Sequence, residues 1–361
     1  MLSIAALDIE RFLGVGYAGF GLVLSLAVAS GIAGNVIGGP LAERIGTSAG
    51  LSRGIAAWSV LMLAAAATGQ PLVFAILWGL GFGAGGVLDT VMNVSATAAL
   101  GPRPGRLARF HAFWNSGALV SAAAVALLLA RGVSWRWPLA AIALLGFPLA
   151  IWVSRSPLPA AARGESHHPL ASFSFVWRER IVMIAIALLA CAVVEGGVDT
   201  WGVLFLRSQL ALGVLTGAGA YLIGQALAVS SRFGLGPLVG RLPAHPAAAV
   251  GAALSGAGLL LESSAPTTLA AVCGLALGVV GVALCWPLLM AAGSRGSARP
   301  GLAVGGLTTA AYGGFLLGPL IVGGIAGGIG LRAALWALAA VALIPAATLL
   351  PRRPRSRKGS L

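Results

Sequence analysis

The chain has 361 residues, of which 58% are apolar and only 9% are charged. A soluble protein carries roughly a quarter charged residues, so this composition excludes an ordinary soluble domain. The formal net charge of +14 does not indicate a nucleic-acid partner, because the basic residues lie in short segments between apolar runs rather than on one face.

Apolar runs follow one another along the chain, and each can cross a hydrocarbon core of about 30 Å at about 1.5 Å per residue. They lack the short alternating pattern of a membrane β-barrel. The sequence therefore predicts an all-α polytopic membrane protein with about 11 transmembrane helices. The expected spans are 13–38, 51–69, 71–99, 108–130, 135–153, 178–206, 213–240, 246–262, 266–292, 301–328 and 331–350.

The longest interruption separates five spans from six and is rich in Pro, Ser, His and Arg. We therefore expect four parts. These are an N-terminal helical bundle (1–153), a linker (154–177), a C-terminal helical bundle (178–351) and a basic tail (352–361) that rests on anionic lipid headgroups.

Most of the 23 Lys and Arg residues fall on one side when the loops are assigned alternately to two sides of a membrane. That side holds Arg44, Arg53, Arg103, Arg106, Arg109, Arg155, Arg163, Arg178, Arg180, Arg241, Arg295, Arg299 and the basic tail; the other holds Arg11, Arg131, Arg136, Arg207 and Arg332. The positive-inside rule then predicts a multi-pass plasma-membrane protein whose linker and C-terminus are cytoplasmic. An outside N-terminus without a signal, and five spans facing six, lead us to expect that a first helix is missing.

One short pattern occurs twice, as GGPLAERIG at 38–46 and as LGPLVGRLP at 235–243. Both copies contain Gly-Pro-Leu with Arg four residues after the Pro, and both end a span on the cytoplasmic side. Chance remains open, because Gly-Pro-Leu also occurs at 318–320. Equivalent positions in two halves favour an internal duplication.

The first copy, within GGPLAERIGTSAGLSRG, resembles the loop signature Gly-x-Leu-Ala-Asp-Arg-x-Gly-Arg-Arg of the major facilitator superfamily. Matching residues are Gly39, Leu41, Ala42, Arg44 and Gly46, while Glu43 stands where Asp is usual and Thr47 and Ser48 replace two basic residues. The resemblance implies a gating loop of Gly39, Glu43, Arg44 and Gly46, whose acid meets a helix N-terminus across the bundle interface.

Three further segments resemble the fucose-permease-like branch of that superfamily. They are LDTVMNVSATAALGPRPGRLARFHAFWNSGALV (88–120), EGGVDTWGVLFLR (195–207) and GLTTAAYGGFLLGPLIVGGIA (306–326). The second has one residue fewer before its Trp than the branch pattern, and Phe205 in place of a Tyr. This resemblance implies a transporter of two pseudo-symmetric helical bundles, here without the first helix.

Polar side chains inside the spans are candidate site residues, because a charge at mid-bilayer costs about 2.5–3.5 kcal/mol on insertion scales. Asp89 and Asn93 share one helix face, as do His111 and Asn115 on the next helix. Similar depths predict that Asp89 meets Asn115 and that Asn93 meets His111. Asn93, His111 and Asn115 fit a purely structural hydrogen-bonded clamp equally well, whereas for Asp89 a functional role is favoured.

Glu195 and Asp199 are also four residues apart, so their carboxylates share one helix face and repel each other. This repulsion favours a proton on one of the two acids, and such a pair suits the coupling of transport to protons. The alternative is that Asp199 simply faces water at the outer mouth. Trp201 suits stacking on a sugar ring or anchoring at the membrane interface, and the second is favoured. Arg232 could bind the substrate or a carboxylate, but a structural role is favoured, in which its long side chain snorkels toward the cytoplasm or serves the bundle interface. Asn35 and Gln225 are further cavity candidates.

Other patterns do not indicate catalysis. GFGAGG at 81–86 lacks the strand that a dinucleotide site needs and indicates close helix packing. His167 and His168 are too few for a structural zinc site, and three Cys within apolar runs do not form a disulfide framework. We expect no enzyme activity, no cofactor and no metal.

The sequence thus predicts a monomeric secondary transporter that moves a small polar solute, a sugar being one candidate, by proton-coupled alternating access. Its partners are the solute, protons and membrane lipids, and not nucleic acid. A drug or metabolite exporter of the same fold and a non-transporting or truncated membrane protein remain open. The solute, the direction of transport and the coupling ion are not fixed by the sequence.

Overall fold

The computed structural model describes residues 2–100, 104–159, 176–177, 181–234, 243–294 and 300–349. At 97, 104–109, 111, 112, 114, 231–234, 294, 300 and 301 it describes the helix but not the side chain. Every regular element in these residues is a helix, which confirms the all-α class. Within them, nine helices are long and apolar enough to cross a membrane, so the count of eleven spans is not confirmed.

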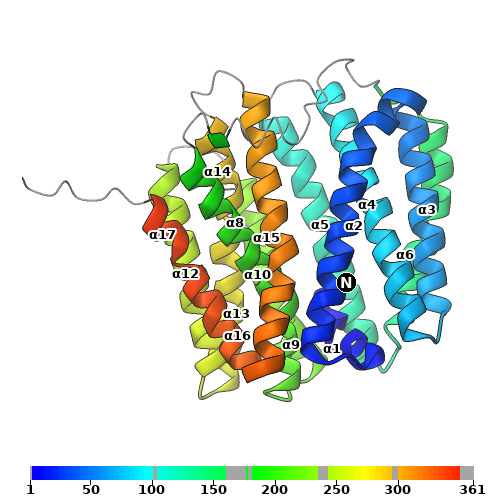
Figure 1. Ribbon diagram of the computed structural model, residues 1–361. Coiled ribbons are helices and arrows are strands. Elements are labelled where there is room, and N and C mark those ends of the chain that lie inside the picture. The colour runs from blue at the N-terminus through cyan, green and yellow to red at the C-terminus, as the bar shows by residue number, and fades with distance from the viewer. Residues whose placement is uncertain are drawn as a thin grey trace, which may run out of the picture.

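Figure 1 shows two groups of helices side by side, which we call the N-terminal and the C-terminal half. The N-terminal half contains α1 (Leu2–Leu13), α2 (Gly16–Ile45), α3 (Thr47–Ala67), α4 (Pro71–Leu100), α5 (Pro104–Ala130) and α6 (Arg136–Ser154). The C-terminal half contains α8 (Val182–Gly197), the π-helix η1 (Val198–Gly202), α9 (Val203–Ser208), α10 (Val214–Gly234), α12 (Ala244–Ser264), α13 (Thr268–Ala283), α14 (Cys285–Ser294), α15 (Pro300–Ile329), α16 (Leu331–Val341) and α17 (Ile344–Leu349).

The two ends of the molecule are named from their elements. The linker end carries the α2–α3 turn and residues 155–159, and it is uppermost in Figure 1. The α1 end, below it, carries α1 and the turns at 68–70, 131–135 and 209–213.

A short helix, α1, precedes the first expected span. It has 12 residues, which is about 18 Å at 1.5 Å per residue and too short to cross a membrane. Its side chains Ile4, Ala5 and Ala6 are fully buried, and it packs against α9, η1 and α5. The expectation that the chain lacks a first helix is therefore not confirmed.

The two halves meet chiefly along two helix pairs, α2 with α15 and α5 with α10, and α1 adds contacts to α9 and η1. In the first pair the backbones approach closely, because a Cβ on Gly21 would collide with the Pro319 carbonyl and the Gly323 backbone. The Ser25 hydroxyl donates a hydrogen bond of 2.8 Å to the Leu316 carbonyl in the same pair. Small residues that permit such contact are the usual means by which helices associate in lipid.

The glycine-rich segment 81–86 packs α4 against α2. A Cβ on Gly83 would lie 2.7 Å from the Ser30 Oγ, and one on Gly86 would collide with the Gly31 carbonyl. The prediction of close helix packing for this segment is confirmed.

The outer surface of the helices suits a lipid environment. Large apolar side chains such as Leu26, Leu72 and Leu145 are between 60% and 72% exposed. Trp137 and Trp152, near the two ends of α6, are 71% and 67% exposed. Exposed tryptophans near both ends of a spanning helix match the aromatic belts at membrane interfaces.

Candidate functional site

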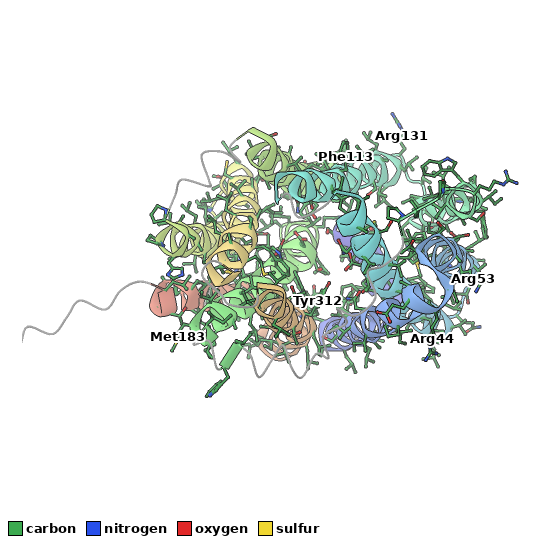
Figure 2. The ribbon with its side chains drawn as sticks, turned by 90° about the horizontal axis from the view of Figure 1, so that it is seen from above. Arg44, Arg53, Phe113, Arg131, Met183 and Tyr312 are labelled. Atoms are coloured by element: carbon green, nitrogen blue, oxygen red, sulfur yellow. The ribbon has the colours of Figure 1, made fainter. Side chains whose placement is uncertain are left out.

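A cluster of polar side chains lies where α4 of the N-terminal half meets α15 of the C-terminal half. The Tyr312 phenol on α15 donates a hydrogen bond of 3.1 Å to Asp89 Oδ2 on α4. Asn93 Nδ2 donates to Asp89 Oδ1 at 3.0 Å and to the Asp89 carbonyl at 2.8 Å. All three side chains are half-buried, and Figure 2 shows Tyr312 near the centre of the molecule when it is seen from the linker end.

The next residue along α4 ties this cluster to α2. The Thr90 hydroxyl donates to the Asn35 carbonyl at 3.0 Å and to Asn35 Oδ1 at 3.2 Å. Asn35 is half-buried, and its role as a cavity residue stays a prediction. Asp89 therefore accepts hydrogen bonds from its own helix and from α15 of the other half, while α2 bonds the neighbouring Thr90.

The expected contact between Asp89 and Asn115 is corrected, whereas the contact between Asn93 and His111 stays a prediction. Asn93 bonds Asp89 on its own helix, because side chains four residues apart lie one above the other. Among the hydrogen bonds of the described residues, none joins Asp89 to the half-buried Asn115, because α5 packs chiefly against α10 rather than α4. The side chain of His111 lies outside the described residues.

Glu195 and Asp199 lie on either side of a change in helix type. Glu195 belongs to α8, whereas Asp199 belongs to η1, whose wider i→i+5 turn departs from the α-helical register that the sequence implied. Both are half-buried. Gln225 on α10 donates to Asp199 Oδ1 at 3.3 Å and to the Tyr221 hydroxyl at 3.0 Å.

Trp201 is fully buried, at 0% exposure, so its interpretation as a membrane-interface anchor is wrong. Its ring meets Phe20 and Tyr17 of α2 edge to face, with centroids 5.7 and 6.2 Å apart. These contacts cross between the halves, so in this conformation Trp201 belongs to the packing of the interface.

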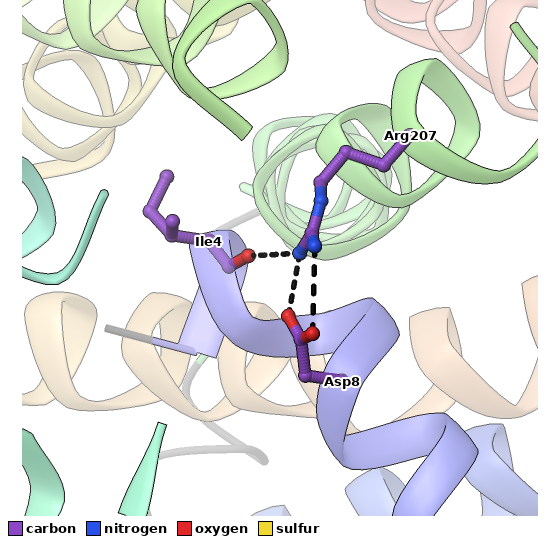
Figure 3. Close-up of polar contacts among 3 residues, drawn as sticks. All are labelled: Ile4, Asp8 and Arg207. Carbon is purple, nitrogen blue, oxygen red and sulfur yellow. Dashed lines mark hydrogen bonds and ion pairs between the residues drawn. The ribbon is translucent and has the colours of Figure 1, made fainter. Parts of the chain in front are cut away.

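An ion pair also joins the halves at the α1 end (Figure 3). Arg207 Nη1 on α9 lies 2.6 Å from Asp8 Oδ2 on α1 and donates to the Ile4 carbonyl at 2.9 Å. The Arg207 side chain is 9% exposed and that of Asp8 is 27% exposed. Beside the pair, the Tyr17 hydroxyl donates to Ser208 Oγ at 3.4 Å. Sequence reasoning missed this pair, although an acid and an arginine that border apolar runs were a usable signal.

The predicted gating loop lies at the linker end. Helix α2 continues through Gly39 and Pro40 to Ile45, and Gly46 makes the turn into α3 with a φ of +82°, which a glycine adopts without strain. Glu43 and Arg44 are exposed, and no hydrogen bond or ion pair is recorded for either among the described residues. Figure 2 shows Arg44 at the rim of the molecule.

Several expectations lie outside the described residues. These are residues 235–242 of the second copy of the repeated pattern (235–243), His167, His168 and the basic tail, together with the side chain of Arg232. No group of three or more His, Cys, Asp or Glu side chains suited to a metal occurs in the part of the chain that the structure describes.

An aromatic pair that sequence reasoning missed borders the site. The rings of Trp286 on α14 and Phe315 on α15 are stacked, with centroids 6.2 Å apart. Phe315 follows Tyr312 by three residues and so shares its helix face. A Cβ on Gly196 would lie 3.3 Å from the Phe315 ring, which brings this ring beside the segment that carries Glu195.

Two helical halves joined by close glycine contacts, with acids between them, define a polytopic membrane protein of the major facilitator fold. The family model described as Major Facilitator Superfamily matches residues 1–301, so the chain belongs to that superfamily. An uncharacterised MFS-type transporter of Yersinia pestis is 26% identical over 250 residues, which is 68% of this chain. The match spans 64% of that relative's length.

Solved structures share the fold. The nucleoside transporter NupG superimposes with a TM-score of 0.79 and 14% identity, covering 96% of this chain and 94% of its own. The fucose:proton symporter FucP of E. coli superimposes with a TM-score of 0.61 and 18% identity, covering 96% and 95%. At these identities only the fold is shared, so membership of the fucose-permease-like branch is not confirmed.

Proposed function

We propose that this chain is a secondary transporter that moves a small polar solute by alternating access between its two halves. The observation that carries the proposal is the hydrogen bond from Tyr312 to Asp89. It links an acid of one half to a donor of the other, so movement of the halves changes the surroundings of the carboxylate. An acid whose partner depends on conformation suits coupling of solute movement to a proton.

The side chains around Asp89 favour a polar solute that contains a ring. Asn35, Asn93 and Tyr312 offer hydrogen-bond donors and acceptors, and the Phe315 and Trp286 rings offer an apolar face nearby. Sugars and nucleosides combine hydroxyl groups with a ring that packs on aromatic side chains. The similar folds include a nucleoside transporter and a fucose:proton symporter, and we therefore propose this solute class.

The linker end is proposed to face the cytoplasm of a plasma membrane. Arg44, Arg53 and Arg155 are exposed at this end, as the positive-inside rule requires. At the α1 end, Arg207 pairs with Asp8, and Arg136 donates to the Ala66 and Thr68 carbonyls. Arg11, Arg131 and Arg332 are also exposed at this end, so the orientation rests on the larger number of Lys and Arg residues that the sequence assigns to the loops of the linker end. On this orientation the Asp8–Arg207 ion pair and the close contact of Gly21 with Pro319 lie on the outer side, and we propose that they close the site toward the outside.

Uptake into proteoliposomes tests the proposal. We expect one member of a panel of hexoses, pentoses and nucleosides to accumulate when a pH gradient is imposed, and Asp89→Asn to abolish that accumulation. Ser121→Ala is a matched control, because the Ser121 hydroxyl bonds only the Ala118 carbonyl of its own helix among its recorded contacts. Uptake indifferent to both the gradient and Asp89→Asn would overturn proton coupling.

A drug or metabolite exporter of the same fold is the alternative, and the Trp286–Phe315 pair also suits such a solute. It predicts that expression protects cells against a panel of amphiphilic compounds and that Asp89→Asn retains protection against uncharged ones. A chain that moves no member of either panel would support a non-transporting membrane protein instead.

A further inference from the structure

A second acid lies away from the Asp89 cluster, inside the C-terminal half. Glu262 on α12 is 1% exposed. Among the residues that the structure describes, neither of its carboxyl oxygens has a hydrogen-bond partner. Gly202 of η1 faces it, since a Cβ on that glycine would lie 3.4 Å from Glu262 Oε1, and the Gly274 backbone of α13 lies against its main chain.

No side chain on the described elements that pack against α12 forms an ion pair with the Glu262 carboxyl group. Their titratable or charged side chains are Cys273 on α13, Cys285 on α14, Arg332 on α16 and Asp199 on η1. Cys285 donates to the Ala248 carbonyl and Asp199 accepts from Gln225, while Cys273 and Arg332 are exposed. A bare carboxylate in such surroundings costs far more than the neutral acid, so the group carries a proton here.

The position of Glu262 also suggests where its proton goes. The residue lies two positions before the end of α12 at Ser264, which is about 3 Å along the helix axis from the α1 end. Gly202, which faces it, directly follows Trp201, and Trp201 packs on Phe20 and Tyr17 of the other half. Separation of the halves at the α1 end therefore removes packing from the π-turn that covers Glu262.

We propose that Glu262 is a proton-binding site of the C-terminal half, separate from Asp89, that exchanges its proton when the α1 end opens. In that step the proton leaves the carboxyl oxygen for water at the α1 end, and the reverse step neutralises the carboxylate again. The π-turn is the moving cover, which agrees with the frequent location of such turns at functional sites.

Infrared spectroscopy of the full chain in lipid vesicles tests the site without a solute, so its outcome is independent of the transport proposal. We expect the carbonyl stretching band of a protonated carboxylic acid to persist at neutral pH and to shift in deuterated water. Glu262→Gln removes the component of this band that arises from Glu262, whereas Asp89→Asn retains that component. A band that is absent from the wild type, or unchanged in Glu262→Gln, would overturn the proposal.

A second pair of variants keeps the test decisive if Glu262→Gln does not fold. Gly202→Ser brings a hydroxyl donor beside the carboxyl group and should lower the band frequency, while Gly202→Ala adds the same Cβ without a donor and should not. Equal spectra for these two variants would count against Glu262 as the origin of the band.

Opening of the α1 end is tested with Asp8→Asn, which weakens the ion pair to Arg207. The deuterium exchange of the band should become at least severalfold faster than in the wild type. Arg332→Gln, which changes an exposed charge near the same end, should leave the exchange unchanged. An exchange rate that Asp8→Asn does not alter would overturn the link between the site and opening.

Discussion

Tyr312 on α15 donates a hydrogen bond of 3.1 Å to Asp89 on α4, so a carboxylate of the N-terminal half is held by a phenol of the C-terminal half. Asn93 holds the other carboxylate oxygen at 3.0 Å. The acid is therefore shared between a partner that moves with it and a partner that does not.

Tyr312→Phe removes the hydroxyl that holds Asp89 from the other half and keeps the aromatic ring. A hydrogen bond to a charged group contributes about 1.5 kcal/mol, so we expect the balance between conformations to shift roughly tenfold away from this one. Distances between spin labels at Arg44 and Met183, exposed positions on opposite halves in Figure 2, report the shift. Thr309→Val, which alters an exposed hydroxyl bonded within α15, should leave the distances unchanged; identical distances in Tyr312→Phe would contradict the prediction.

Asp8→Asn should loosen the α1 end. Replacing the carboxylate leaves the Arg207 charge only 9% exposed and without its acid, at a cost of about 2 kcal/mol or roughly thirtyfold in the equilibrium. The measurement is the rate at which a maleimide labels a cysteine introduced as Ser208→Cys, with Cys273 replaced by Ser. Labelling as slow as in the parent chain would show that the ion pair does not hold this end closed.

Gly21→Leu should prevent α2 and α15 from closing at the α1 end, because even a Cβ would collide with the Pro319 carbonyl. We expect fast labelling of Ser208→Cys and loss of uptake in a chain that still inserts into the membrane. Gly328→Ala is the control on α15, since a Cβ there meets no atom within 4 Å. Normal uptake by Gly21→Leu would mean that the halves do not need this contact.

Arg136→Gln should destabilise the N-terminal half rather than change transport directly. The guanidinium donates to the Ala66 and Thr68 carbonyls and lies 4.4 Å from the Phe12 ring centroid. Loss of these contacts costs about 2–3 kcal/mol, which lowers the unfolding temperature in detergent by several degrees. Arg131→Gln, at an exposed neighbouring position, should not lower it. Equal unfolding temperatures for the two variants would contradict this role.

The general architecture could be predicted from the sequence because it depends on local quantities. Length and hydropathy of each run determine whether it can cross a bilayer, so the all-α class and the acids inside the apolar runs could be predicted, although the count of eleven spans is not confirmed. The role of the glycines at 81–86 was predicted for the same reason, since a run of small residues inside a span has few other uses.

The partners of the polar side chains could not be predicted. Similar depths along neighbouring helices predicted that Asp89 contacts Asn115. However, α5 packs chiefly against α10. The hydrogen bond to Asp89 comes instead from Tyr312, more than two hundred residues away in the sequence. The interpretation of Trp201 was wrong because the sequence around a tryptophan near the end of a span does not show whether its side chain faces lipid headgroups or another helix. The π-turn that begins between Glu195 and Asp199 could not be predicted either, because no residue pattern marked its start.

The sequence by itself determined that this protein is a bundle of membrane-crossing helices with a few acids in apolar runs. The reason is that the free-energy cost of exposing backbone polar groups or charges to lipid depends on each residue and its immediate neighbours in the sequence. Only the tertiary structure decided the surroundings of each acid. Asp89 lies at the interface between the halves, Asp8 pairs with Arg207 at the α1 end, and Glu262 is buried without a hydrogen-bond partner among the described residues. These surroundings depend on how the N-terminal and C-terminal halves pack against each other. That packing brings together residues that are far apart in the sequence, and the sequence does not indicate which of them will be in contact.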